Sequence, residues 1–127
     1  MSISRHFVLA AGGTGGHMIP AHAVAQELTA RGHHVALVTD ERGAKIPAIF
    51  EDATVHVLPA GRLQGGPLGW AKALRGILAG REMARRMYST FQPSVVVGFG
   101  GYPALPALLG ALKDGIPTVI HEQNAVL

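Results

Sequence analysis

The chain has 127 residues, of which 48% are hydrophobic and 15% charged, and it carries a formal net charge of +3. This length suits one domain, and the composition argues against an intrinsically disordered chain. There is no cysteine, which excludes disulfides and thiolate metal sites. The seven histidines are scattered without the spacing of a known zinc motif, so we expect no metal site.

The first recognisable unit is a buried strand, a glycine loop and a helix. The apolar run 7–11 is followed by Gly-Gly-Thr-Gly-Gly-His at 12–17. Apolar residues then recur at helical spacing, with Pro20 expected in the first turn: Ala21, Val24, Ala25 and Leu28. Glycines let the backbone approach a ligand, and the first N–H groups of a helix attract anions. The pattern predicts a phosphate or diphosphate site.

His17 is the unusual residue of this loop. The loop is not a dinucleotide fingerprint, because Met18 stands at the third glycine position, and no Lys-Ser/Thr pair completes a P-loop. A helix N-terminus disfavours imidazolium, so we expect His17 to be neutral and able to accept a proton. Two interpretations remain open from the residues alone: a general base, or a histidine that caps or packs.

The rest of the chain alternates strands and helices. We expect strands at 35–39, 54–58, 94–97 and 116–121 and helices at 67–91 and 104–113. One face of the long helix is expected to contain Trp70, Leu74, Ile77, Leu78, Ala84, Tyr88 and Phe91. The uncharged stretch 87–112 contains three prolines and four glycines, so we interpret it as a strand, a loop and a buried helix rather than a membrane span. The alternation predicts a doubly wound parallel sheet ordered 3-2-1-4-5.

A second glycine loop occupies residues 98–103 and repeats the first arrangement of strand, glycines and helix start. In the predicted order, strands one and four are neighbours, so both loops flank the point where the topology switches. The last strand brings His-Glu-Gln-Asn at 121–124 to the same edge. Three such segments at one edge favour a ligand site over a set of structural turns.

The segments GGTGGH, GFGGYPALP and HEQN, in this order and spacing, resemble the N-terminal half of the MurG family. These bacterial enzymes transfer N-acetylglucosamine from UDP-N-acetylglucosamine to undecaprenyl-diphosphate-linked muramyl-pentapeptide in peptidoglycan synthesis. The resemblance spans the whole chain. It implies a GT-B glycosyltransferase: two Rossmann-like domains, no metal or other cofactor, and inversion at the anomeric carbon.

The resemblance makes residues 1–127 a single, acceptor-side domain and assigns most donor contacts to a C-terminal domain that these residues do not contain. We therefore expect them to be inactive alone. Thr14, Gly15 and Gly16 would contact the donor sugar or the acceptor diphosphate. His17 would be the base that takes the proton of the acceptor hydroxyl.

The second loop and the last segment receive roles from the same resemblance. Gly100, Gly101 and Tyr102 would form a second anion-binding loop, and Asn124 would hydrogen-bond the transferred sugar. Many family members have a serine where this chain has Ala104, so a hydroxyl contact at that position is not expected here.

Residues 62–86 contain six basic residues and one acidic residue, a net charge of +5. Apolar side chains lie among them: Leu63, Leu68, Trp70, Leu74, Ile77 and Leu78. Either this segment binds an anionic membrane surface, or its apolar residues face the sheet while the cations are solvated. The resemblance favours the membrane, and places the protein peripherally on the cytoplasmic face of the inner membrane. Few aromatic residues and no known motif argue against nucleic acid.

Two other functions remain open. Asp40, at the end of the second strand, stands where the ribose-binding acid of an NAD-dependent oxidoreductase would stand. Met18 and the second glycine loop argue against that class. The other alternative is a non-catalytic half of a split glycosyltransferase that docks the lipid and recruits a separate catalytic chain.

Overall fold

In the computed structural model, which describes residues 4–13, 15–45, 53–58, 66–101 and 103–121, a five-stranded parallel sheet forms the centre. Its order is β3-β2-β1-β4-β5, as predicted from the alternation of strands and helices. The strands are β1 (His6–Ala10), β2 (His34–Thr39), β3 (Thr54–Val57), β4 (Val95–Gly98) and β5 (Thr118–Ile120). The helices are α1 (Gly15–Ala30), α2 (Glu41–Ala44), α3 (Gly66–Phe91) and α4 (Ala104–Lys113). The α/β class and the sheet order are therefore confirmed.

The register of the sheet aligns the ends of the central strands. Ala10, the last residue of β1, pairs with Val38 on one side and with Gly98 on the other. The segments that follow β1 and β4 therefore leave the sheet at the same level, side by side. This alignment places both glycine loops at the carboxyl edge of the strands.

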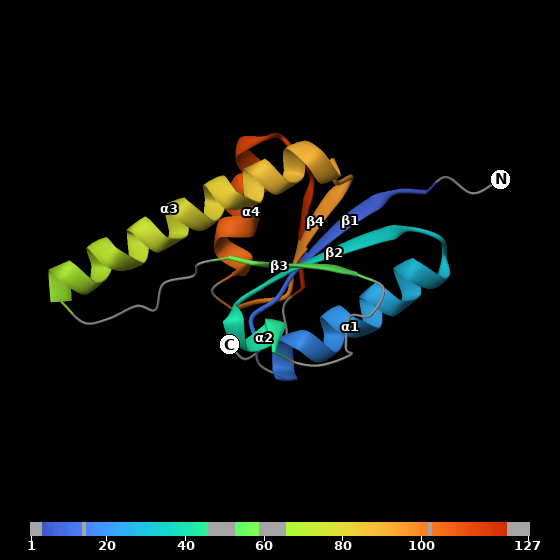
Figure 1. Cartoon of the computed structure of the whole chain (residues 1–127), viewed down its shortest axis with the longest axis horizontal. Coiled ribbons are helices and arrows are strands. Elements are labelled where there is room, and N and C mark those ends of the chain that lie inside the picture. The colour runs from blue at the N-terminus through green and yellow to red at the C-terminus, as the bar shows by residue number, and fades with distance from the viewer. Residues whose placement is uncertain (1–3, 14, 46–52, 59–65, 102, 122–127) are drawn as a thin grey trace.

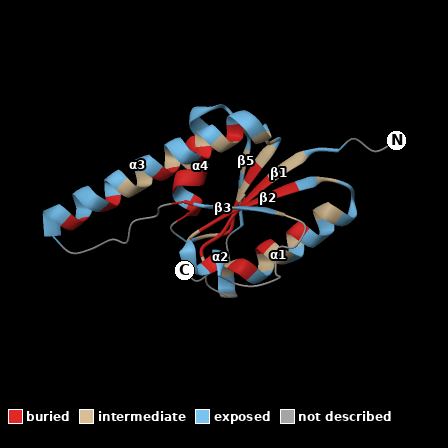
Figure 2. Cartoon of the chain, in the orientation of Figure 1, coloured by how far each residue is buried: buried red, intermediate tan, exposed pale blue. Residues whose placement is uncertain are grey.

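Helices cover both faces of the sheet, with α1 on one face and α3 and α4 on the other (Figure 1). Side chains alternate along β1, so that Val8 packs toward α3 and α4 while Leu9 packs toward α1. Figure 2 shows the resulting buried band through the central strands. Burial on both faces explains why these strands are continuous apolar runs.

The structure differs from the local predictions at two places, one within the first helix and one just after the second strand. Helix α1 begins at Gly15, within the glycine loop, so that Pro20 is inside the helix rather than in its first turn. The short helix α2 was not predicted. Asp40 is its N-cap and accepts a hydrogen bond from the N–H of Gly43.

The apolar face predicted for the long helix is wrong at its N-terminal half. Trp70, Leu74 and Leu78 are exposed, with exposed fractions of 62%, 58% and 41%. The buried positions are instead mostly small: Gly69, Ala73, Gly80, Ala84 and Tyr88. Small residues allow helix α4 to approach closely: a Cβ on Gly110 would lie 3.2 Å from the carbonyl oxygen of Arg81 and 3.4 Å from the Cβ of Ala84. The large side chains are left outside this contact.

No helix within the described ranges is both long and apolar enough to cross a membrane. The stretch 87–112 consists of the end of α3, strand β4 and most of α4, as predicted.

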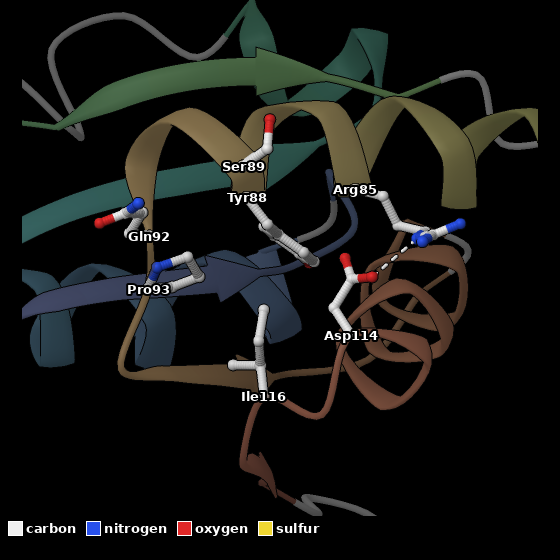
Figure 3. A pocket seen from close by; sticks show the side chains of 7 residues that line it. All are labelled: Arg85, Tyr88, Ser89, Gln92, Pro93, Asp114 and Ile116. Atoms are coloured by element: carbon white, nitrogen blue, oxygen red, sulfur yellow. Dashed lines mark hydrogen bonds and ion pairs between the residues drawn. The ribbon is translucent and has the colours of Figure 1, made fainter.

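The junction of α3 and α4 is fixed by two polar contacts. The buried hydroxyl of Tyr88 donates to the carbonyl oxygen of Ala107 at 2.7 Å. Nearby, the Arg85 guanidinium reaches from α3 to the Asp114 carboxylate, with an Nε–Oδ1 distance of 2.9 Å (Figure 3). Burial of the Tyr88 phenol, and secondarily the Asp114 carboxylate, raise the pKa of Tyr88. Tyr88 is therefore protonated in the folded protein well above the pH at which a free tyrosine ionises.

We expect Tyr88→Phe to lower the free energy of unfolding by about 1–2 kcal/mol at neutral pH, because a buried hydrogen bond is lost. A raised folded-state pKa stabilises the protein fully below the ordinary tyrosine pKa of 10.0 and progressively less above it. The deficit of the variant should therefore shrink as the pH rises from about 9 to about 11. Urea unfolding of both proteins measures this. Ser89→Ala, at an exposed neighbouring position, should change stability by less than about 0.5 kcal/mol at either pH.

Candidate functional site

The two glycine loops are in backbone contact. The N–H of Gly12 donates to the carbonyl oxygen of Gly100 at 2.9 Å. A Cβ on Gly101 would lie only 2.7 Å from the Cα of Gly12. Gly100 and Gly101 also have φ values of +107° and +86°, which side chains rarely allow. The prediction that both loops lie at one edge of the sheet is confirmed.

His17 is the third residue of α1, and its half-buried ring lies against the second glycine loop. A Cβ on Gly100 would be 2.8 Å from the Cδ2 and Nε2 atoms of this ring. A Cβ on Gly101 would be 3.4 Å from its Nδ1. The absence of side chains at both positions makes room for the imidazole, so His17 is packed and also belongs to the rim of a pocket.

This pocket of about 410 Å³ opens between α1, the loop after β4, α4 and β5. Its lining consists of Gly16, His17, Gly98, Phe99, Gly100, Gly101, Ala104, Leu108, Ile120 and His121. The volume is within the range of small-molecule sites. The first backbone N–H groups of α1 have no acceptor within the helix and carry its positive dipole end, which suits an anionic group.

His121 brings the third predicted segment to the pocket. Its backbone N–H donates to the carbonyl oxygen of Gly98 at 2.8 Å, and its ring packs edge-on against Phe99 with centroids 5.4 Å apart. The expected convergence of the segment after β5 is thus confirmed at its first residue. The following residues 122–124 lie outside the described part of the chain.

The structure brings together four of the residues predicted for the site: Gly16, His17, Gly100 and Gly101. Gly15 begins α1 next to them, whereas Thr14, Tyr102 and Asn124 lie outside the described residues. Sequence reasoning missed the apolar part of the lining: Phe99, Leu108 and Ile120. Apolar residues just beyond or inside buried elements resemble core residues in a sequence, so no signal distinguishes them.

The role considered for Asp40 in an oxidoreductase is wrong. Its Oδ1 accepts the N–H of Gly43 at 2.9 Å, and its Oδ2 accepts the N–H of Gly13 at 3.2 Å. A ribose-binding acid must have its oxygens available to the sugar hydroxyls. This carboxylate holds the protein backbone instead.

Among the described residues there is no group of three or more His, Cys, Asp or Glu side chains that could hold a metal ion.

Comparison with known proteins gives the family. The model of the glycosyltransferase family 28 N-terminal domain matches residues 7–127. The chain belongs to this family. An N-acetylglucosamine transferase of Zymomonas mobilis, named for UDP-N-acetylglucosamine and N-acetylmuramyl-(pentapeptide) pyrophosphoryl-undecaprenol, is 67% identical over 127 residues, all of this chain and 33% of that protein. The protein of the same name from Novosphingobium aromaticivorans is 67% identical over 126 residues, 99% of this chain and 32% of its own length.

Among solved structures, the crystal structure of Acinetobacter baumannii MurG superposes with a TM-score of 0.80 at 32% sequence identity. The match covers 95% of this chain and 36% of that one. The Rossmann-like fold of an N-terminal glycosyltransferase domain is therefore confirmed. This chain spans about a third of the length of the curated relatives it matches.

The contact between the glycine loops predicts a difference between two glycine substitutions. Gly101 and Gly32 have nearly the same φ, +86° and +85°, but a Cβ on Gly32 has no atom within 4 Å. Gly32→Ala should cost only the left-handed conformation, about 1 kcal/mol. Gly101→Ala adds a clash with the backbone of Gly12 and should cost about 2–4 kcal/mol in total. Equal losses in urea unfolding would contradict the contact between the loops.

Proposed function

We propose that this chain is the acceptor-side half of an inverting transferase that moves N-acetylglucosamine from UDP-N-acetylglucosamine to undecaprenyl-diphosphate-linked muramyl-pentapeptide. Two relatives that carry this activity in their names, from Zymomonas mobilis and Novosphingobium aromaticivorans, are 67% identical to the chain over essentially its whole length. The observation that carries the proposal is the position of His17, against the second glycine loop and on the rim of the pocket.

The site supplies a base next to an anion-binding helix end. His17 takes the proton of the acceptor hydroxyl as the hydroxyl oxygen forms a bond to the anomeric carbon of the donor sugar. The bond between that carbon and the β-phosphate oxygen breaks on the opposite face, and UDP leaves with the electron pair. The anomeric configuration is thereby inverted. The step needs the neutral imidazole, because only that form has a ring nitrogen that can accept the proton.

The N-terminus of α1 and the second glycine loop are the groups that suit phosphate oxygens. We assign the acceptor diphosphate or the donor sugar to Thr14, Gly15 and Gly16, and a second anion contact to Gly100, Gly101 and Tyr102. Asn124 is assigned to the transferred sugar. Most contacts to the nucleotide are assigned to a second Rossmann-like domain, as the GT-B architecture implies.

In the full-length transferase, His17→Ala should lower kcat by about 10²–10⁴-fold, because a general base within reach of the hydroxyl contributes that much. His17→Asn keeps a polar side chain but removes the basic nitrogen, so it should be nearly as damaging. Steady-state kinetics with both substrates measures this, and the KM for UDP-N-acetylglucosamine should change little.

His34→Asn is the matched control, because His34 is exposed at the opposite end of the sheet and should retain wild-type kcat. If His17→Asn retained most of the activity that His17→Ala loses, the residue would position the substrate and not act as a base. If both variants were fully active, His17 would be a packing residue only.

Helix α3 supports a peripheral contact with an anionic membrane. Trp70, Leu74 and Leu78 follow one another at intervals of four residues, so they form an exposed apolar line along the helix. Arg75 is three residues from Leu78 and so borders this line; it is exposed and forms no ion pair with a described residue. In Figure 1 the N-terminal half of α3 extends beyond the sheet. Apolar residues beside cations bind membranes that contain anionic lipids, and each cation adds about 1 kcal/mol.

The double variant Trp70→Ser with Leu74→Ser should bind vesicles that contain phosphatidylglycerol about 10–100-fold more weakly than the wild type, because two apolar side chains no longer enter the interface. Vesicle co-sedimentation measures this. Arg75→Glu should weaken binding only at low salt. Leu112→Ser, at an exposed leucine of α4, is the control and should bind normally. Equal binding of the double variant and the wild type would contradict the assignment of this surface.

A further inference from the structure

The carboxylate of Asp40 lies between the first glycine loop and the turn that follows β2. One oxygen accepts the N–H of Gly43 at 2.9 Å, and the other accepts the N–H of Gly13 at 3.2 Å. The side chain is only 20% exposed. Hydrogen bonds to an ionised acceptor that is partly shielded from water are stronger than those between neutral groups. One side chain thus ties together two segments that are 27 residues apart.

The two segments are too close for any side chain between them. A Cβ on Gly13 would lie 2.4 Å from the backbone nitrogen of Gly43 and 2.5 Å from the Oδ1 of Asp40. A glycine at position 13 therefore allows the first loop and the turn after β2 to come this close. The ligand phosphates suggested by the glycine pattern cannot use the N–H of Gly13, because Asp40 accepts it.

The first loop is held on both sides just before α1 begins. The N–H of Gly12 points to the second glycine loop, and the N–H of Gly13 points the other way, to Asp40. Helix α1 starts two residues later at Gly15, and His17 is its third residue. The two bonds thus hold the backbone just before the turn whose third residue, His17, places its ring against Gly100.

We propose that Asp40 is a positioning residue of the transferase: through its hydrogen bond to Gly13 it sets the path of the first glycine loop and thereby the place of His17. The inference rests on the proposed function, in which His17 is the base. Asp40 itself touches no substrate. A shift of about 1 Å in a catalytic group is enough to lower a rate about 10²-fold.

The N-cap role of Asp40 is separable from its hold on Gly13. Ser and Asn cap helices about as well as Asp, so Asp40→Ser and Asp40→Asn still satisfy the N–H of Gly43. Serine has one short acceptor and does not reach both N–H groups. Asparagine has a single acceptor oxygen, and its NH₂ group would face the second N–H. Both variants therefore keep α2 capped and release Gly13.

In the full-length transferase, Asp40→Ser and Asp40→Asn should lower kcat by about 10–100-fold while the KM for UDP-N-acetylglucosamine stays within about twofold. Arg42→Ala is the matched control: Arg42 is 3.9 Å from the same carboxylate, its side chain is 62% exposed, and the variant leaves both backbone bonds in place. It should retain wild-type kcat. Wild-type kcat in both Asp40 variants, or a rise in KM alone, would overturn the proposal.

A double-variant cycle tests whether Asp40 acts through His17. If it does, adding Asp40→Asn to His17→Asn should lower the residual rate by less than about twofold, because the base is already absent. If Asp40→Asn lowered kcat by the same factor in His17→Asn as in the wild type, the proposal would be overturned.

A readout independent of activity is amide hydrogen exchange of the segment 11–18. Exchange should accelerate about tenfold or more in Asp40→Ser, because Gly13 loses its acceptor, and should stay at the wild-type rate in Arg42→Ala. If the exchange of residues 11–18 were unchanged in Asp40→Ser, the inference that Asp40 restrains this loop would be overturned. Full activity of His17→Asn would overturn the role proposed for His17, and the exchange rates would then still decide whether Asp40 holds Gly13.

Discussion

The close backbone contact between the two glycine loops is the constraint on which the site depends. Strands β1 and β4 are hydrogen-bonded neighbours that end at the same level, with Ala10 opposite Gly98. The segments that leave them must pass each other within van der Waals distance, and a Cβ at Gly12 or Gly101 would meet the other loop at 3.1 Å or 2.7 Å. Glycine is the residue that permits this approach. The same lack of side chains admits the His17 ring, so the sheet register ultimately determines where the proposed base lies.

A comparable use of small residues shapes the opposite face. Helix α3 turns glycines and alanines toward α4, and the two helices approach closely at Gly110. The larger apolar side chains in the N-terminal half of α3 lie outside this contact, and Trp70 there is 62% exposed. An exposed apolar line on a long helix costs solubility unless another surface covers it. Arg75, the exposed cation beside it, makes an anionic membrane the surface that we propose.

The sheet order could be predicted from the sequence because alternating strands and helices leave few topologies, and the convergence of the loops then followed from parallel strands. The exposed apolar line of α3 could not, since helical periodicity alone does not show which side of a helix packs against the rest of the protein. The hold of Asp40 on Gly13 depends on a contact between distant segments. Asp40, a preferred N-cap residue, followed by the acidic Glu41 did provide a local signal for α2. The roles of Thr14, Tyr102 and Asn124 stay predictions.

The hydrogen bonds of the first loop also explain why its glycine pattern departs from that of dinucleotide-binding proteins. Gly12 and Gly13 both donate their N–H groups within the protein, one to the second loop and one to Asp40. These glycines serve backbone contacts, so the anion-binding capacity of the segment begins with the first turn of α1. Phosphate oxygens bound there lie next to His17, and the positive end of the helix dipole attracts them. The proposed base and the proposed anion site therefore share the first turn of α1, and the backbone contacts of Gly12 and Gly13 hold the chain just before that turn.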